Sequence, residues 1–127
     1  MKQSFDSSKQ LIVVKARLLG PRGDTMMNLA LDTGATESLI GWDSLTVVGY
    51  STDDTDSYVE MLTGSGTKTS PILKIKQLEC LGKRRRGMRV VAHSLPAGAT
   101  VDGLLGLDFF RNSRLTIDFR KDTLKLD

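Results

Sequence analysis

Residues 28–40 read "NLALDTGATESLI", and this stretch decides how the chain is interpreted. Residues 28–31 fit a strand that runs into the interior, but Asp32 follows where another apolar residue is expected. A buried carboxylate is costly unless it is hydrogen-bonded, paired or neutralised. Thr33 and Gly34 offer a hydroxyl group and a closely approaching backbone N–H. The stretch is therefore either a surface turn with ordinary turn chemistry or a functional site.

The composition predicts one folded domain. The 127 residues are 39% hydrophobic and 26% charged, which is enough for a core and argues against disorder. The net charge is only +3, and much of it lies within residues 83–89.

The sequence contains no expected membrane segment. No apolar run approaches ~20 residues, and residues 1–10 lack the apolar centre of a signal peptide. A cytoplasmic location is favoured, with a soluble domain of a membrane-anchored or larger protein as the alternative.

The wider pattern predicts an all-β domain of short strands with one or two helical turns. Residues 11–19 and 25–32 form an expected hairpin around a turn at 20–24. Residues 58–62 and 68–80 flank a glycine-rich tip and predict a longer hairpin. The other expected elements are strands at 38–41, 88–93, 114–119 and 123–126, a helical turn at 42–45, an acidic mobile loop at 49–57, a turn at 81–87, and a strand leading into a short helix at 104–112.

A second motif lies downstream, in residues 101–112, "VDGLLGLDFFRN". With residues 28–40 and the glycine-rich hairpin between them, it resembles the retropepsin-like aspartic proteases. That family has Asp-Thr/Ser-Gly-Ala after an apolar strand, then a flap hairpin, then an apolar-apolar-Gly element before a short helix. The match in order and spacing covers about residues 11–127. The segment from residue 102 onward is more similar to cellular, including bacterial, members than to viral ones.

The resemblance implies a fold and an activity. The expected fold is a retropepsin-like acid protease half-barrel with a flap hairpin and one short helix, assembled as a homodimer. The expected organisation is an N-terminal extension at residues 1–10 and a protease domain at residues 11–127. The implied function is an aspartic endopeptidase that hydrolyses peptide or protein substrates and needs no cofactor or metal. Viral relatives build much of their dimer interface from interleaved termini, and the C-terminal segment here is long enough for this.

Roles for the residues around Asp32 follow from the same resemblance. Asp32 of each subunit is the catalytic carboxylate that activates water. Thr33 bonds across the dimer, and Gly34 presents its N–H to the carboxylate. Ala35 and Thr36 line the floor of the site. Related enzymes often have serine or threonine in place of Ala35, hydrogen-bonded to the ionised aspartate, so we expect activity to extend to weakly acidic or near-neutral pH.

Two further groups complete the site that the resemblance implies. One group packs beneath the active loop: Leu104, Leu105 and Gly106. The other forms the flap tip that closes over substrate: Thr63, Gly64, Ser65 and Gly66.

Several alternatives remain open at this level. The same fold can serve as a catalytically silent dimerisation or peptide-binding module. Asp102 or Asp108 could pair with Asp32 in one chain, but neither has the motif. We therefore assign Asp108 to capping or starting the short helix and Asp102 to shaping the turn before it.

The remaining chemically notable residues have plainer interpretations. A single histidine, His93, and a single cysteine, Cys80, argue against zinc sites built from several such ligands and against most Cys/His mechanisms. A Ser/His/Asp triad with His93 lacks a serine motif, so a surface position is favoured, and Cys80 fits the core. Residues 83–89, "KRRRGMR", fit a solvated turn better than a nucleic-acid or acidic-partner site, so no nucleic acid is expected. Trp42 is expected in the core rather than in a substrate pocket.

Overall fold

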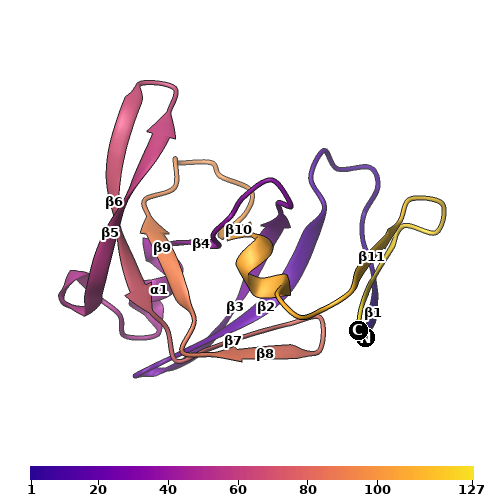
Figure 1. Cartoon of the computed structure of the whole chain (residues 1–127), viewed down its shortest axis with the longest axis horizontal. Coiled ribbons are helices and arrows are strands. Elements are labelled where there is room, and N and C mark those ends of the chain that lie inside the picture. Colours follow the sequence, from indigo (N-terminus) through magenta and orange to yellow (C-terminus); the bar gives the residue numbers. More distant parts are fainter.

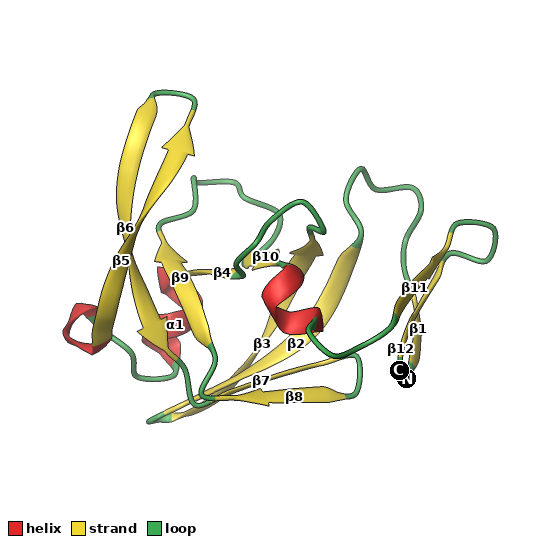
Figure 2. Ribbon diagram, in the orientation of Figure 1, coloured by secondary structure: helices red, strands yellow, loops and turns green.

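The chain folds into two antiparallel or mixed sheets with short helical segments (Figures 1 and 2). The computed structural model describes the backbone of residues 1–127 and every side chain except that of Thr63. The expected flap role of the Thr63 side chain therefore lies outside the described residues. A nine-stranded sheet has the order β5-β6-β9-β4-β10-β3-β2-β7-β8, and a three-stranded sheet has the order β1-β12-β11. The predicted all-β fold class is confirmed.

The strands are β1 (Lys2–Ser4), β2 (Val13–Gly20), β3 (Gly23–Leu31), β4 (Leu39–Gly41), β5 (Thr55–Thr63), β6 (Gly66–Lys74), β7 (Gln77–Cys80), β8 (Lys83–Arg86), β9 (Arg89–His93), β10 (Gly103–Leu105), β11 (Leu115–Asp118) and β12 (Thr123–Leu126). The helical segments are α1 (Trp42–Val47) and the 3-10 helices η1 (Thr52–Asp54) and η2 (Leu107–Phe110). None of the helices in the described part of the chain is long and apolar enough to cross a membrane.

The β2–β3 hairpin forms the base of the fold, as predicted. Its register runs from Val13 opposite Ala30 to Gly20 opposite Gly23. Because side chains alternate across a strand, one face of β2 is buried throughout while the other is exposed or half-exposed. The core gathers beneath this hairpin around the fully buried Phe109. Burial of apolar side chains here is the main term that stabilises the fold.

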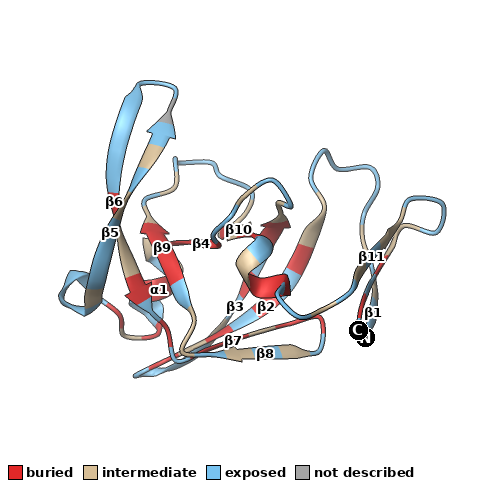
Figure 3. Cartoon of the chain, in the orientation of Figure 1, coloured by how far each residue is buried: buried red, intermediate tan, exposed pale blue. Residues whose placement is uncertain are grey.

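The β5–β6 hairpin projects from the body and is mostly exposed (Figures 1 and 3). We call it the flap. Its two strands pair up to Thr63 opposite Gly66, with Gly64 and Ser65 in the turn. Only residues 72–74 of β6 pair with the body, on β9. The predicted long hairpin with a glycine-rich tip is confirmed.

Three local predictions were wrong. The expected single strand at 68–80 divides into β6 and β7, which lie in distant parts of the sheet. The expected turn at 81–87 is a two-residue turn followed by strand β8, which pairs with β7. The expected loop at 49–57 contains η1, where Ser51 and Asp54 form a reciprocal capping box, and β5 begins at Thr55, whereas its mobility stays a prediction.

The two ends of the chain meet in the small sheet (Figure 1). Strand β1, which was not predicted, pairs with β12 through residues 2–4. Leu124 and Leu126 of β12 are buried in the core. Residues 1–10 thus contribute a strand, and their division from a domain at 11–127 stays a prediction. Strand β12 lies between β1 and β11 of its own chain.

Candidate active site

Asp32 lies directly after β3, where the chain leaves the sheet. Strand β10 runs parallel to β3, with Leu105 opposite Leu31. The backbone N–H of Asp32 donates to the Leu105 carbonyl over 2.9 Å. The N–H of Leu31 donates to the Ile12 carbonyl over 2.8 Å on the other side of β3. The strand that delivers Asp32 is therefore held along both edges.

The turn after Asp32 brings a donor to its carboxylate. The Gly34 N–H donates to Asp32 Oδ1 over 3.0 Å, and the Ala35 N–H donates to the Asp32 carbonyl over 3.1 Å. A Cβ at Gly34 would lie 3.3 Å from Oδ1, so glycine allows this close approach. Asp32 is half-buried, whereas Thr33 and Gly34 are exposed. The loop therefore presents the Asp32 carboxylate, in a fixed orientation, at the surface of the chain.

Helix η2 holds the other side of the loop. The N–H groups of Leu107 and Asp108 donate to the carbonyls of Ala35 and Thr36, over 2.8 and 3.2 Å. The loop crosses Gly106 so closely that a Cβ there would lie 2.8 Å from the Ala35 carbonyl oxygen. Residues 32–36 and 104–106, predicted as one site, are brought together in space.

A buried serine connects these two segments. The Ser38 hydroxyl donates to Asp108 Oδ1 over 2.7 Å and accepts from the Gly106 N–H over 2.9 Å. The Ser38 N–H donates to Asp108 Oδ2 over 2.9 Å. Asp108 lies in the first turn of η2, which agrees with the prediction that it caps or starts this helix, but its side chain is not the cap, because Gly106 is the N-cap residue and makes no side-chain bond. Ser38 was not predicted as a site residue, although a hydroxyl directly before an apolar pair was the available signal.

A pocket of about 200 Å³ lies between the active loop and the flap. Its lining combines the loop, β4, β5, β9 and β10, and consists of Ala35, Thr36, Glu37, Leu39, Val59, Met61, Val91 and Leu104. Val59 and Met61 face this pocket while their neighbours on β5 are exposed. Neither residue was predicted to line the site, although the alternation in residues 58–62 was the signal. The flap tip at Gly64 and Ser65, together with Gly66, stands apart from the loop in Figure 1.

Other candidate groups have structural surroundings. His93 is half-buried, with Nδ1 3.4 Å from the Ser70 hydroxyl. Burial raises the pKa of the Cys80 thiol to about 12, so the thiol stays protonated and is a poor nucleophile. The Asp102 carboxylate accepts from the Asn28 N–H over 2.8 Å. Within the described residues, no group of three or more His, Cys, Asp or Glu side chains is placed to hold a metal ion.

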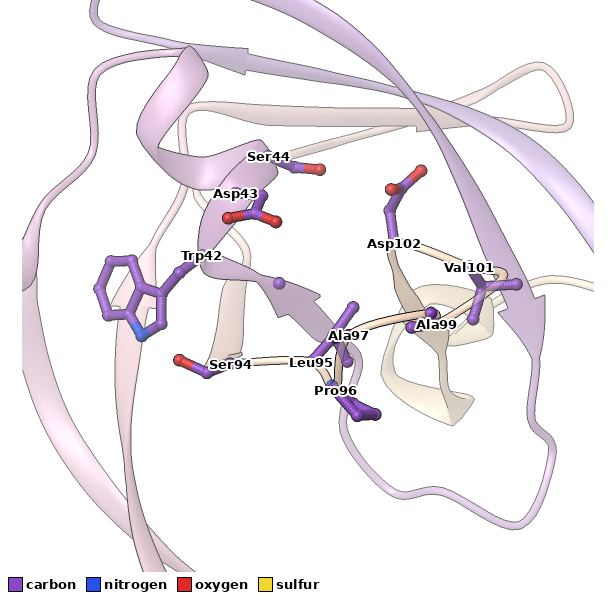
Figure 4. A pocket seen from close by; sticks show the side chains of 12 residues that line it. Trp42, Asp43, Ser44, Ser94, Leu95, Pro96, Ala97, Ala99, Val101 and Asp102 are labelled. Atoms are coloured by element: carbon purple, nitrogen blue, oxygen red, sulfur yellow. The ribbon is translucent and has the colours of Figure 1, made fainter.

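A second pocket, of about 250 Å³, lies between the start of α1 and the loop at residues 94–102 (Figure 4). Trp42, Asp43 and Ser44 line one side of it. Trp42 also packs against the core, which agrees with its predicted position. No residue of the 32–38 loop lines this pocket, so it is separate from the candidate site.

Comparison with known proteins agrees with this geometry. A family model described as aspartyl protease matches residues 14–109, which is most of the chain. The structure is similar to a retropepsin-like aspartic protease from Rickettsia conorii, with a TM-score of 0.71 and 16% identity over 100% of this chain and 97% of that one. It is also similar to EIAV protease, solved with the inhibitor HBY-793, with a TM-score of 0.60 and 15% identity over 84% and 91% of the two chains.

No curated protein sequence matches the chain. At these identities the structural likeness establishes the fold, and the family model establishes the family. The resemblance found in the sequence is confirmed: the chain belongs to the aspartyl protease family and has the retropepsin-like fold.

Proposed function

We propose that this protein is an aspartic endopeptidase, and that it hydrolyses peptide bonds through a water activated by two Asp32 carboxylates, one from each subunit of a homodimer. The observation that carries the proposal is the half-buried Asp32, oriented by the Gly34 N–H in a loop fixed by β10 and η2. Such rigid, accessible placement is what a catalytic carboxylate needs. Membership of the aspartyl protease family supports the same chemistry.

The hydrogen bonds of two nearby carboxylates, Asp102 and Asp108, support the proposal of a second copy. Asp102 accepts a hydrogen bond from the Asn28 N–H, and Asp108 accepts two from Ser38. Both are committed to holding the fold, so neither is available as the partner of Asp32. A two-fold axis beside the loop would supply the second Asp32. Thr33 and Leu107 are exposed on this loop and its supporting helix, where a second subunit would cover them.

The mechanism uses the two carboxylates in different protonation states. Two carboxylates in contact do not both ionise easily, so they share one proton and titrate as a pair. The ionised member takes a proton from a bound water while the water oxygen attacks the peptide carbonyl carbon. The protonated member gives its proton to the carbonyl oxygen, and a proton then passes to the departing amine. The Gly34 N–H keeps Asp32 Oδ1 oriented throughout.

The substrate would be an extended peptide held under the flaps, pairing through its backbone. The pocket shared by the loop and the flap is mainly apolar, with Leu39, Val59 and Met61 in its lining. An apolar side chain of the peptide would fill it and gain the free energy of burial. Cleavage between hydrophobic residues is therefore the expected specificity.

The test is cleavage of a diverse peptide library across pH, with dimer content recorded for each sample. Asp32→Asn keeps the shape of the side chain and removes its acid–base function, so we expect cleavage to fall by at least about a thousandfold. Asp43→Asn, at an exposed position on α1, is the matched control and should leave cleavage unchanged.

Two results would contradict the proposal. Full activity in a strictly monomeric sample would exclude the two-subunit site. A folded dimer that binds peptides and cleaves none would favour a catalytically silent peptide-binding module.

A further inference from the structure

The basic run in residues 83–86 has two chemically different faces. These residues form β8, so alternate side chains point to opposite sides. Arg84 and Arg86 are exposed, and they contact Glu79 and Gln77 on the neighbouring strand. Lys83 and Arg85 are half-buried and point toward the end of η2 and the residue that follows it. Only half of the run is therefore a solvated surface.

Lys83 and Arg85 bind the backbone at the end of η2. Arg85 Nε donates to the Phe109 carbonyl over 3.0 Å, and the Arg85 guanidinium also donates to the Arg111 carbonyl. Lys83 Nζ donates to the same Arg111 carbonyl over 3.0 Å and to the Ser113 hydroxyl. Carbonyls at the end of a helix lack donors within the helix. Charged donors make the stronger hydrogen bonds to them.

This arrangement keeps two cations close together. Burial and the neighbouring Arg85 guanidinium both lower the pKa of Lys83. The two positive charges repel each other, so their hydrogen bonds to the shared Arg111 carbonyl must offset that repulsion. A solvated turn would let the two side chains separate. Their convergence on one carbonyl indicates that fixing the end of η2 is what they do.

The opposite end of η2 holds the active loop. Leu107 and Asp108 donate their N–H groups to the loop, and the Gly106 N–H donates to Ser38. Helix η2 spans only Leu107–Phe110, so a single turn connects the loop to the carbonyls that Lys83 and Arg85 bind. Phe109 and Phe110 of this turn are buried. Helix η2 thus connects β8 to the active loop at Ala35 and Thr36.

We infer that Lys83 and Arg85 are positioning residues for the Asp32 loop, acting through η2. The inference rests on the proposed function for its catalytic consequence. Neither side chain touches the reacting atoms. Without them the end of η2 loses its charged donors, and the crossing of Gly106 beneath the loop is less constrained. A displacement of about 1 Å at a reacting group can cost a hundredfold in rate.

The test compares alternate residues of the same strand in the dimeric protein. Arg85→Met and Lys83→Met remove the donors to η2, and Arg84→Met and Arg86→Met are the matched controls on the exposed face. We expect Arg85→Met to lower kcat by about tenfold while KM stays within about twofold, because orientation rather than binding is lost. Arg85→Lys keeps the charge but not the planar fork, so it should recover part of kcat.

Amide hydrogen exchange without substrate gives the second readout. We expect the Leu107 and Asp108 amides to exchange about tenfold faster in Arg85→Met, relative to core amides of β2 and β3. The inference is overturned if Arg85→Met matches Arg84→Met in both readouts, or if exchange accelerates equally throughout the core. If Arg85→Met does not fold, Arg85→Lys and Lys83→Met carry the same comparison. If the wild type cleaves nothing, the proposed function fails, and the exchange readout alone decides this inference.

Discussion

Two glycines, Gly106 beneath the active loop and Gly64 at the flap tip, are present for opposite reasons. A Cβ at Gly106 would lie 2.8–2.9 Å from three backbone atoms of the loop, at Ala35 and Glu37. A Cβ at Gly64 would meet nothing within 4 Å. The first glycine allows two segments to pack closely. The second leaves a projecting turn without side-chain bulk.

The same contrast holds for how the two regions are attached. The active loop is held by β10, by η2 and by the buried Ser38. The flap pairs with the body only through residues 72–74 of β6, supported by the Arg89–Asp56 ion pair. A catalytic carboxylate must stay in place, whereas a covering element must move to admit a peptide. The difference suggests that the fold gives each region the attachment that its proposed role requires.

Replacing each glycine by alanine tests this contrast most strongly. Gly106→Ala forces backbone to move, so we expect the free energy of unfolding to fall by about 2–3 kcal/mol and peptide cleavage to be largely lost. Gly64→Ala should change the free energy of unfolding by less than about 0.5 kcal/mol. Chemical denaturation of both variants measures the difference. Equal destabilisation by the two substitutions would show that the crossing at Gly106 is not constrained.

Ser38→Ala should have the next largest effect. It leaves the Gly106 N–H and one Asp108 oxygen without their partner, so we expect a loss of about 1–3 kcal/mol in the free energy of unfolding. Cleavage should fall as well, because the loop and η2 lose their shared hydroxyl. Ser94→Ala, at an exposed serine, is the control. A Ser38→Ala protein as stable and active as the control would remove Ser38 from the site.

The motifs of the site could be predicted from sequence because each is local. Asp32-Thr33-Gly34 and Leu104-Leu105-Gly106 are contiguous runs, and β-sheet pairing then brings the runs together. Ser38 and Asp108 could not be paired in advance, since they are 70 residues apart. The glycine-rich flap tip was also predictable, because turn chemistry is local.

The errors in the fold have different physical origins. Leu73 and Ile75 are buried while Lys74 and Lys76 are exposed. This alternation continues from the end of β6 to the start of β7, so the pattern predicts one strand where the structure has two. Residues 83–86 pair with the neighbouring strand β7, but the run of four positive charges suggested a turn, and the carbonyls that Lys83 and Arg85 bind are distant in sequence. The capping box of η1, in contrast, could have been predicted from the sequence, because its Ser-x-x-Asp pattern is local.

Ala35→Ser sharpens the description of the active loop through pH. A serine hydroxyl near the Asp32 carboxylate would donate to its ionised form and favour that form. The ionised form would then persist to lower pH, so we expect the whole activity profile to move toward acid by up to about one pH unit. The measurement is kcat/KM between pH 3 and 8, with Ala97→Ser as the control. An unchanged profile would show that residue 35 does not influence the pair.

The smallest predicted effect is at the base of the flap. Asp56 Oδ2 lies 2.5 Å from Arg89 Nε, and both side chains are well exposed, so the pair contributes about 0–1 kcal/mol. We expect Asp56→Asn to leave kcat unchanged and to alter KM by no more than about threefold, because only the anchoring of the flap weakens. Amides of residues 72–74 should exchange faster, and salt should reduce the difference from wild type.

Asp24→Asn is the control, because it breaks the exposed Arg17–Asp24 ion pair, which lies away from the flap. A fall in kcat larger than that of Ser38→Ala would reverse the comparison, since the flap base would then matter more to the chemistry than the loop that holds Asp32.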